Sequence, residues 1–324
     1  MASLKEILKT VGTIFEQESF LSEPKELYEP IEYTLRLGGK RIRPSLVIAA
    51  NQMFGGSDED VHNAAIGIEV FHNFTLLHDD LMDKSPLRRG KETVYRKWNE
   101  NTAILSGDTM FALAWRYYLK QPHPQLQEIL NCFNETAIGV CEGQQFDMNF
   151  ESCNDITIND YMEMIRLKTA VLLAGALKIG ALYAQAPKED VERLYNFGIH
   201  FGLAFQLQDD LLDAYGDVAV FGKQTGQDIR DNKKTYLPLR AMELASKTDQ
   251  EELKKLFTNF DGDAEEKVSR VLAIYSHINI QEEVEKAIEK EMNMAISELN
   301  AINIDEERKR PLRELLNTMQ GRQS

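Results

Sequence analysis

Two short segments of the chain carry three aspartates in the same order. They read HDDLMD and QDDLLD, and their aspartates are Asp79, Asp80 and Asp83 in the first and Asp209, Asp210 and Asp213 in the second. In a helix, residues three and four positions apart share a face, so each segment would gather its carboxylates on one turn. Like charges this close repel, and magnesium bound to carboxylates and substrate phosphates would offset the repulsion. The spacing therefore predicts two walls of a magnesium–diphosphate site.

The alternative interpretation of either segment is an acidic patch that faces water. Both segments, however, end a strongly apolar stretch and precede a glycine-containing loop with basic residues, at 84–91 and 216–234. A solvated patch does not require this shared context. The two copies together favour the metal-binding interpretation.

Basic side chains that could hold phosphate oxygens occur near both segments. Those of residues 38–44 fall between two predicted helices, at a helix N-terminus whose free N–H groups also favour anions. An arginine pair follows the first acidic segment, and planar guanidinium groups suit phosphate. One isolated lysine carries no information, but the arrangement indicates diphosphate binding. In chain order, and including one adjacent threonine, these residues are Lys40, Arg41, Arg43, Arg88, Arg89, Lys168, Thr169, Lys223 and Lys233.

The elements that would position these residues are predicted to be helical almost throughout. Apolar residues recur at three- and four-residue intervals, and strand-like alternation is hard to find. Gly38 and Gly39 are typical of a helix end, and Ser57 with its acidic neighbours is typical of a helix start. We therefore expect one large all-α domain over residues 1–324. The predicted helices cover 24–37, a stretch beginning near Pro44, 57–83, 102–119, 124–150, 158–184 and 188–215.

Composition excludes several classes of protein. The 52 acidic residues outnumber the 37 Lys and Arg and give a net charge of −15, which argues against binding to nucleic acid or anionic membranes. The longest apolar stretch, 170–186, is interrupted by Lys178 and is too short for a convincing membrane span. Three cysteines without a CxxC pair, and an N-terminus without a secretory leader, predict a reduced, cytoplasmic protein.

In its motifs the chain resembles the trans-isoprenyl diphosphate synthase, or polyprenyl synthetase, family in its short-chain branch. The resemblance implies the isoprenoid synthase fold, a helical bundle around a central cavity. It also implies a homodimer and a magnesium-dependent condensation of isopentenyl diphosphate with allylic prenyl diphosphates. The matching motifs are GGKRIRP (38–44), HDDLMD with RRG (78–83 and 88–90), GDTMF (107–111), GQQFD (143–147), RLKTA (166–170), FQLQDDLLD (205–213) and GKQTGQDIRDNKKTY (222–236).

The resemblance also implies roles for individual residues. The isopentenyl diphosphate contacts would be Lys40, Arg43, His72 and Arg89. The ligands of three magnesium ions would be Asp79, Asp83 and Asp209, supported by Asp80, Asp210 and Asp213. The remaining contacts to the allylic diphosphate would be Arg88, Lys168, Thr169, Gln206, Lys223 and Lys233, with Gln144 and Asp147 beside the metals.

Residues that precede the first acidic motif are candidates for limiting product length. Phe74, Thr75 and Phe71 lie five, four and eight residues before Asp79, which at a helical rise of ~1.5 Å per residue is roughly 6–12 Å away. From the residues alone, the two rings are better interpreted as ordinary core aromatics. In the family, an aromatic at the fifth position limits growth, and an adjacent pair at the fifth and fourth resembles farnesyl-producing enzymes. Phe74 followed by Thr75 resembles geranylgeranyl producers, so we expect geranylgeranyl diphosphate, with farnesyl diphosphate as the alternative.

Two other classes of function remain open from the sequence. A class I terpene cyclase also ionises an allylic diphosphate with magnesium, but it needs no isopentenyl diphosphate site. A non-catalytic partner subunit could bind prenyl diphosphates without turning them over. Such a subunit would not need both acidic motifs and could lose one of them without penalty. Both acidic motifs and the basic residues Lys40 and Arg43 are present here, which favours the condensing enzyme.

Overall fold

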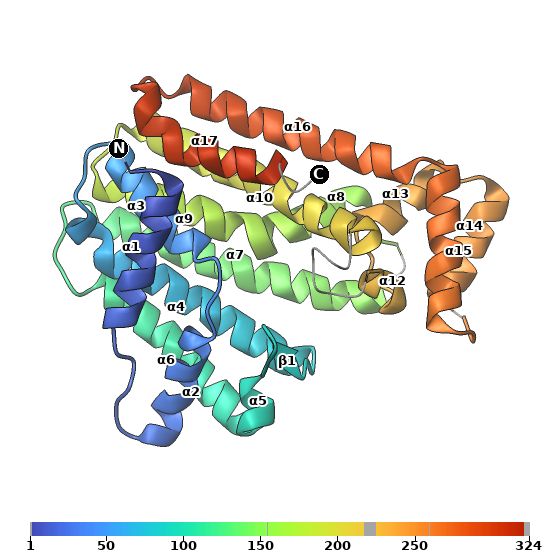
Figure 1. Cartoon of the computed structure of the whole chain (residues 1–324), viewed down its shortest axis with the longest axis horizontal. Helices are drawn as coiled ribbons and strands as arrows, with labels where there is room; N and C mark the ends of the chain where they lie inside the picture. The colour runs from blue at the N-terminus through green and yellow to red at the C-terminus, as the bar shows by residue number, and fades with distance from the viewer. Residues whose placement is uncertain (1, 154, 217–224, 259, 321–324) are drawn as a thin grey trace. The chain divides into compact units, whose positions relative to one another are not determined.

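The computed structural model describes residues 2–153, 155–216, 225–258 and 260–320. It is all-α, as predicted, and the strands among the described residues are two pairs of residues only (Figure 1). The chain forms two compact units. Unit 1 comprises Met1–Phe133, Gly175–Leu194 and Asn303–Ser324, and unit 2 comprises Asn134–Ala174 and Tyr195–Ile302.

Unit 1 is built around one long helix, α4 (Asp58–Met82), which packs against α3 and α6 (Figure 1). A capping box between Ser57 and Asp60 starts α4, since their side chains satisfy N–H groups of the first turn. The prediction of a helix over 57–83 is thus confirmed. The other helices of unit 1 are α1 (Leu4–Gln17), α2 (Lys25–Arg36), α3 (Ile42–Met53), α5 (Val94–Lys97), α6 (Glu100–Tyr118) and α17 (Glu306–Gln320).

A short hairpin follows α4 where the sequence predicted only a basic loop. Strands β1 (Leu87–Arg88) and β2 (Lys91–Glu92) pair antiparallel. Arg89 and Gly90 form the turn between them, with φ angles of 53° and 74°. The hairpin fixes the direction of the two arginines that follow the first acidic motif.

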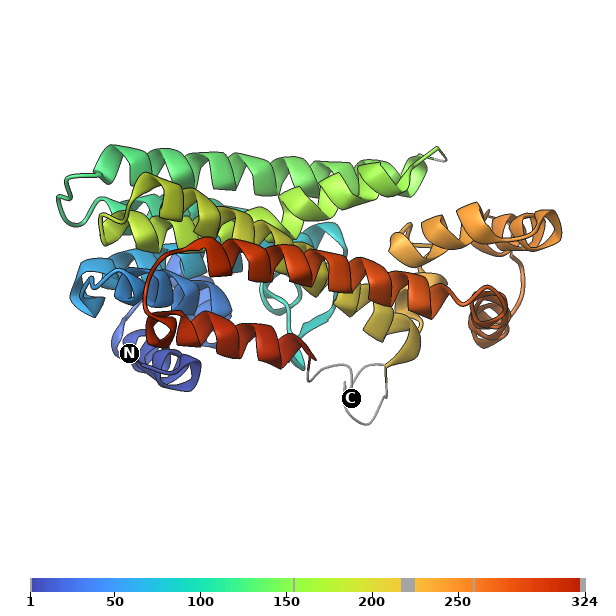
Figure 2. The ribbon, with the colours of Figure 1, turned by 90° about the horizontal axis from the view of Figure 1, so that it is seen from above.

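Unit 2 contains the second acidic motif and most of the helices between residues 134 and 302. Three helices have residues in both units: α7 (Leu126–Ser152), α9 (Val171–Tyr183) and α10 (Lys188–Tyr215). The elements within unit 2 are α8 (Ile158–Ile165), the π-helical turn η1 (Arg166–Ala170), α12 (Gln227–Arg230), α13 (Tyr236–Leu244), α14 (Lys247–Thr258), α15 (Ala264–His277) and α16 (Ile280–Ala301). Figure 2 shows α14 and α15 packed together beyond the N-terminal end of α16.

The π-helical turn η1 interrupts what the sequence predicted as one helix over 158–184. Glycines on two neighbouring helices let the backbone of η1 come close. A Cβ at Gly143 of α7 would lie 2.3 Å from N of Lys168, and a Cβ at Gly202 of α10 would lie 2.5 Å from Cα of Ala170. Larger residues there would displace Lys168 and its neighbour, and π-helical turns are frequent at functional sites.

No helix within the described part of the chain combines the length and apolar character needed to cross a bilayer.

Candidate functional site

The predicted site residues divide between the two units. Unit 1 holds Lys40, Arg43, Phe71, His72, Phe74, Thr75, Asp79, Asp80, Asp83, Arg88 and Arg89. Unit 2 holds Gln144, Asp147, Lys168, Thr169, Gln206, Asp209, Asp210, Asp213 and Lys233. Lys223 lies outside the described residues.

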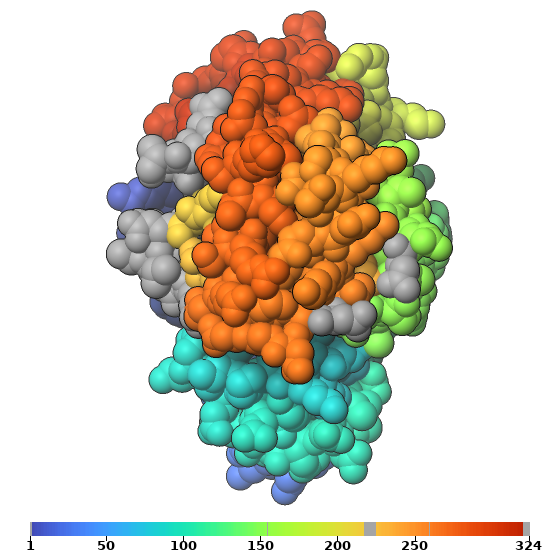
Figure 3. All heavy atoms as spheres, turned by 90° about the vertical axis from the view of Figure 1, so that its right-hand side faces the viewer, coloured from blue at the N-terminus to red at the C-terminus, as the bar shows by residue number. Residues whose placement is uncertain are grey.

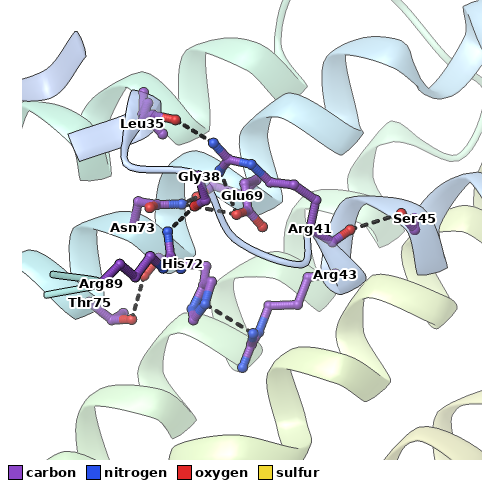
Figure 4. A network of polar contacts seen from close by, with 10 residues as sticks. All are labelled: Leu35, Gly38, Arg41, Arg43, Ser45, Glu69, His72, Asn73, Thr75 and Arg89. Carbon is purple, nitrogen blue, oxygen red and sulfur yellow. Dashed lines mark hydrogen bonds and ion pairs between the residues drawn. The ribbon is translucent and has the colours of Figure 1, made fainter. Parts of the chain in front are cut away.

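The turn between α2 and α3 has a backbone shape that requires glycine. Gly38 and Gly39 have φ angles of 84° and 131°, and Arg41 has a φ of 49°. A Cβ at position 39 would lie 2.7 Å from Nη2 of Arg89. The guanidinium of Arg89 thus lies directly against this turn and donates a hydrogen bond to the Gly38 carbonyl (Figure 4). Two segments of the predicted isopentenyl diphosphate site meet here within unit 1.

Arg41 has a structural role that separates it from its neighbours. Its Nη1 lies 2.6 Å from Oε1 of Glu69, a carboxylate that is almost fully buried on α4, and its Nη2 donates to the Leu35 carbonyl. Asn73 donates to the same Glu69 oxygen at 3.1 Å. Arg41 thus holds the turn on α4, and its charge is paired with Glu69.

The guanidinium of Arg43 contacts the imidazole of His72 beside this turn. Nη1 of Arg43 lies 3.0 Å from Nε2 of His72, toward which it points (Figure 4). Burial lowers the pKa of Arg43 to about 10. Burial, followed by the charge of Arg43 and of three other arginines, lowers the pKa of His72 well below its ordinary value. His72 is therefore neutral, its Nε2 accepts from Arg43, and the surrounding charge is strongly positive, as a diphosphate site requires.

The depressed pKa of His72 predicts a pH dependence of stability. The unfolded chain takes up a proton near the ordinary histidine pKa and the folded protein does not, so the free energy of unfolding falls as the pH falls below about 6.5. We expect the contribution of His72 to be a loss of about 1 kcal/mol between pH 6.5 and 5.5. Denaturant titrations of the wild type and of His72→Gln at both pH values measure it. Equal losses in the two proteins would contradict the assignment of a neutral His72.

The first acidic motif divides into one buried and two more exposed carboxylates. Asp80 is 5% exposed, and Nε of Arg88 lies 2.8 Å from each of its oxygens. Burial raises the pKa of Asp80, while the hydrogen bond from Arg88 opposes the rise. Asp79 and Asp83 lie one turn apart, since N–H of Asp83 donates to the carbonyl of Asp79 at 2.8 Å, and both side chains are more accessible than that of Asp80. This division fits two metal ligands and one supporting carboxylate.

The second acidic motif is tied to η1 through a chain of hydrogen bonds. The hydroxyl of Thr169 donates to Oε1 of Gln206 at 3.1 Å, and Nε2 of Gln206 donates to Oδ1 of Asp210 at 3.1 Å. The hydroxyl of Tyr161 donates to the other oxygen of Asp210. Burial raises the pKa of Asp210 to about 7. Because both ends of its amide are bonded, Gln206 is held in one orientation next to Thr169.

Lys168 is placed beside an acidic residue of α7. Its Nζ lies 2.5 Å from Oδ2 of Asp147, so the structure links two residues that the sequence assigned separately. Gln144, one turn earlier on α7, has a buried Oε1 without a hydrogen-bond partner among the described residues. Lys168 and Asp147 therefore form an ion pair within unit 2, one turn of α7 from the buried amide of Gln144.

Sequence reasoning missed Asp228, which lies inside the 222–236 motif. Its N–H donates to Oδ2 of Asp213 at 3.0 Å, and burial followed by the charge of Asp213 raises its pKa to about 6. A recess in unit 2 is lined by Asp210, Asp213, Asp228 and Lys233 together with apolar side chains. The signal was available, since Asp228 is one of two acidic residues between the two predicted lysines of the motif.

Lys234 differs from Lys233 although the two are adjacent. Nζ of Lys234 donates to the carbonyls of Phe150 at 2.8 Å, Glu151 at 3.4 Å and Cys153, at the C-terminus of α7. A cation is favourable there because the last carbonyls of a helix lack intrahelical partners. N–H of Lys233 donates to the carbonyl of Asp228 at 2.8 Å, and its charge lowers the pKa of Asp228. Only Lys233 of the two thus belongs to the acidic recess.

The carboxylate sets fit a hard divalent cation. Within the described residues no three His, Cys, Asp or Glu side chains are close enough to hold a metal by themselves. Magnesium in phosphate sites usually takes only one or two carboxylates and completes its shell with water and substrate oxygens. Within unit 1, Asp79 and Asp83 offer accessible carboxylate oxygens one turn apart, and this number of ligands matches that requirement.

The chain is similar to known prenyl diphosphate synthases. The family model described as polyprenyl synthetase matches residues 24–275. The geranylgeranyl diphosphate synthase of Methanosarcina mazei is 40% identical over 232 residues, which are 71% of each protein. The geranylfarnesyl diphosphate synthase of Natronomonas pharaonis is 37% identical over 258 residues, covering 74% of this chain and 76% of that protein.

Solved structures show the same fold. A crystal structure of a geranylgeranyl pyrophosphate synthase has a TM-score of 0.94 and 41% identity, and the match covers 100% of both chains. The geranylgeranyl pyrophosphate synthetase from Pyrococcus horikoshii Ot3 has a TM-score of 0.90 and 30% identity, covering 98% of this chain and 97% of that one. The fold and the paired acidic motifs define a trans-prenyltransferase with the isoprenoid synthase fold. The chain belongs to the polyprenyl synthetase family, which confirms the resemblance, the fold class and the enzyme class expected from its motifs.

Proposed function

We propose that the protein condenses isopentenyl diphosphate with allylic diphosphates and releases geranylgeranyl diphosphate. The observation that carries the proposal is the cationic group of unit 1, in which Arg43 contacts His72 and Arg89 lies against the 38–44 turn. A terpene cyclase needs one diphosphate site, next to its acidic motifs. A second cationic group of this kind supports a second, metal-free diphosphate substrate, which is what a condensing enzyme binds.

In this proposal Asp79, Asp83 and Asp209 hold three magnesium ions together with the allylic diphosphate. The ions would neutralise charge that develops on the diphosphate as its allylic C–O bond breaks. Asp80 keeps Arg88 directed at the site through the bonds described above, and Asp210 and Asp213 support the second motif. Lys168, Lys223 and Lys233 supply further positive charge to the same diphosphate.

Thr169 and Gln206 have a second proposed role beside the allylic cation. Their oxygen atoms are held by the hydrogen-bond chain that ends at Asp210, so their dipoles are fixed before the substrate binds. Preorganised dipoles stabilise developing charge without the cost of reorienting during the reaction. The double bond of isopentenyl diphosphate attacks the cation, and the released diphosphate takes the proton that is lost.

The expected product length rests on the aromatic residues below the first acidic motif. Phe74 packs against Phe111 of α6 with ring centroids 5.5 Å apart, and against Phe71 at the same distance. Phe111 belongs to the GDTMF motif, and sequence reasoning gave it no role. A wall with one ring from each of two helices supports a product of limited length, and geranylgeranyl diphosphate synthases are among the relatives. Farnesyl diphosphate is the alternative product.

We also propose that the protein is a homodimer, with α6 in the interface. Ile104 and Leu105 on α6 are 44% and 59% exposed, and adjacent exposed apolar side chains are typical of an interaction surface. Leu105→Glu would place charges in that interface. We expect this variant to be monomeric in light scattering after size exclusion, whereas Leu21→Glu, at an exposed leucine before α2, remains a dimer. A monomeric wild type, or a dimeric Leu105→Glu, would contradict the proposal.

The proposed location is the cytoplasm. Among the described residues, Cys132, Cys141 and Cys153 form no disulfide. Surface cysteines outside disulfides, as at positions 141 and 153, are typical of a reducing compartment.

The direct test of the activity uses the purified full chain with isopentenyl diphosphate. Dimethylallyl, geranyl and farnesyl diphosphates are supplied separately, each with magnesium and with magnesium removed by chelation. We expect elongation from the allylic substrates that depends on both magnesium and isopentenyl diphosphate. Hydrocarbon products without isopentenyl diphosphate would indicate a cyclase. Binding of substrate without any turnover would indicate a non-catalytic subunit.

A further inference from the structure

Helix α15 holds the short helix α12 and the loop that follows it through three contacts within unit 2. Nη2 of Arg230 lies 2.8 Å from Oε1 of Glu265. A Cβ at Gly226, where φ is 78°, would lie 2.8 Å from Cγ1 of Val268, so the backbone of α12 comes close to α15. The third contact is made by Lys267, between these two residues of α15.

Lys267 is buried although it carries an ammonium group. The residue is 5% exposed, and its Nζ donates to Oδ1 of Asn232 at 2.7 Å and to the carbonyl of Arg230 at 3.3 Å. Its Nζ also lies 5.4 Å from the centre of the Phe257 ring. A buried ammonium is costly unless acceptors satisfy it. One acceptor belongs to the last residue of α12 and the other to the loop that follows, so the ammonium of Lys267 holds the end of α12 and the start of that loop.

The segment held by Lys267, which is α12 with the loop that follows it, carries residues of the acidic recess. Asp228 donates its N–H to Asp213 at 3.0 Å, and Lys233 donates its N–H to the carbonyl of Asp228 at 2.8 Å. On its other side the loop is attached to the end of α7 through Lys234. Tyr275, two turns after Lys267 on α15, lines the recess together with Asp228. A shift of α12 and of the loop after it would therefore move Asp228 and Lys233 relative to the second acidic motif.

We propose that Lys267 is a positioning residue that holds Asp228 and Lys233 at the second acidic motif, so that α15 sets the affinity for the magnesium–allylic diphosphate. This inference rests on the proposed function. Sequence patterns gave the region after residue 236 no chemistry, and α15 forms part of the outer surface of unit 2 (Figure 3).

The test compares Lys267→Met with Arg270→Met in the full-length enzyme. Arg270 is on the same helix, but it forms its ion pairs with Glu252 and with Glu266 rather than with α12. We expect Lys267→Met to raise the KM for geranyl diphosphate, and the magnesium concentration for half-maximal rate, by about five- to tenfold. The KM for isopentenyl diphosphate should stay within about twofold, because its proposed contacts are in unit 1. Arg270→Met should leave all three values within about twofold of the wild type.

Asn232→Gly tests the same contact from the other side, because the ammonium of Lys267 stays in place and keeps the carbonyl of Arg230 as an acceptor. Asn232 has a φ of 57°, which glycine adopts readily, and the substitution removes only the side-chain acceptor of Lys267. We expect a smaller rise in the KM for geranyl diphosphate. Combined with Lys267→Met it should add little, since residues that act through one contact are not additive.

The outcomes separate a positioning role from a structural one. A lower kcat with every KM unchanged would mean only a smaller amount of active enzyme, and it would overturn the proposal. Equal rises in KM for both substrates would also overturn it. If Lys267→Met does not fold, Asn232→Gly decides between the same outcomes.

If the wild type elongates no allylic substrate, the proposed function fails, and calorimetry with magnesium and inorganic diphosphate tests the role of Lys267 separately. Weaker binding in Lys267→Met than in Arg270→Met supports it, and equal binding overturns it.

Discussion

Asp79→Asn lowers kcat/KM for the condensation by about 10²- to 10⁴-fold, because the variant loses a charged ligand of the ions that stabilise the departing diphosphate. Asp79 is one turn from Asp83, and it is more accessible than the neighbouring Asp80, which is paired with Arg88. Steady-state rates at saturating magnesium measure the effect. A higher magnesium concentration should restore only part of the activity, since asparagine is a weaker ligand than a carboxylate.

Two further variants make the result specific. Glu59→Gln removes an exposed charge from the first turn of the same helix and should leave the rate within about twofold. Asp209→Asn should lower kcat/KM about as much as Asp79→Asn does, because both residues are proposed magnesium ligands. If Asp79→Asn retains more than about a tenth of the wild-type kcat/KM, Asp79 is not a ligand whose charge the reaction needs.

Phe74→Ala lengthens the product, so that chains longer than geranylgeranyl diphosphate become the major fraction. The ring of Phe74 packs between His78, at 4.9 Å, and Phe111, at 5.5 Å between ring centroids. Removing it opens space along α4 below the acidic motif, where the growing chain would extend. Incubation with isopentenyl and farnesyl diphosphates, followed by mass spectrometry of the products, measures the chain length. An active variant with an unchanged product distribution would place the length limit elsewhere.

The neighbouring residue supplies a matched pair of controls. The hydroxyl of Thr75 donates to the carbonyl of His72 on its own helix at 2.8 Å, so Thr75→Ala should leave the product unchanged. Thr75→Phe adds a second aromatic next to Phe74 and should shorten the product to farnesyl diphosphate. Opposite shifts from Phe74→Ala and Thr75→Phe would locate the limit at this turn of α4.

Most of the fold was predictable because local signals and hydrophobic periodicity agreed. The capping box at Ser57 and the glycines at 38 and 39 place helix ends where the structure has them. The π-helical turn η1 was not predictable, since it depends on the close approach of Gly143 and Gly202 from two other helices. Such contacts are tertiary and leave no periodic signal in the segment itself.

The sequence predicts which motifs make up the candidate site. It does not predict which residues within a motif pair with which other side chains. Arg41 and Arg43 are two residues apart in one motif, yet Arg41 is paired with buried Glu69 and Arg43 with His72. Lys233 and Lys234 likewise divide between the acidic recess and the end of α7. Residue type and spacing cannot separate such neighbours, because the direction of each side chain is set by backbone geometry and by elements distant in sequence.

The measurement that tests the central claim most directly is the length of the main product formed from dimethylallyl and isopentenyl diphosphates by the wild-type protein with magnesium. We expect geranylgeranyl diphosphate. Farnesyl diphosphate as the end product would keep the condensing enzyme and contradict the length limit assigned to Phe74. A folded protein that forms no elongated product from any allylic substrate would contradict the proposed function itself.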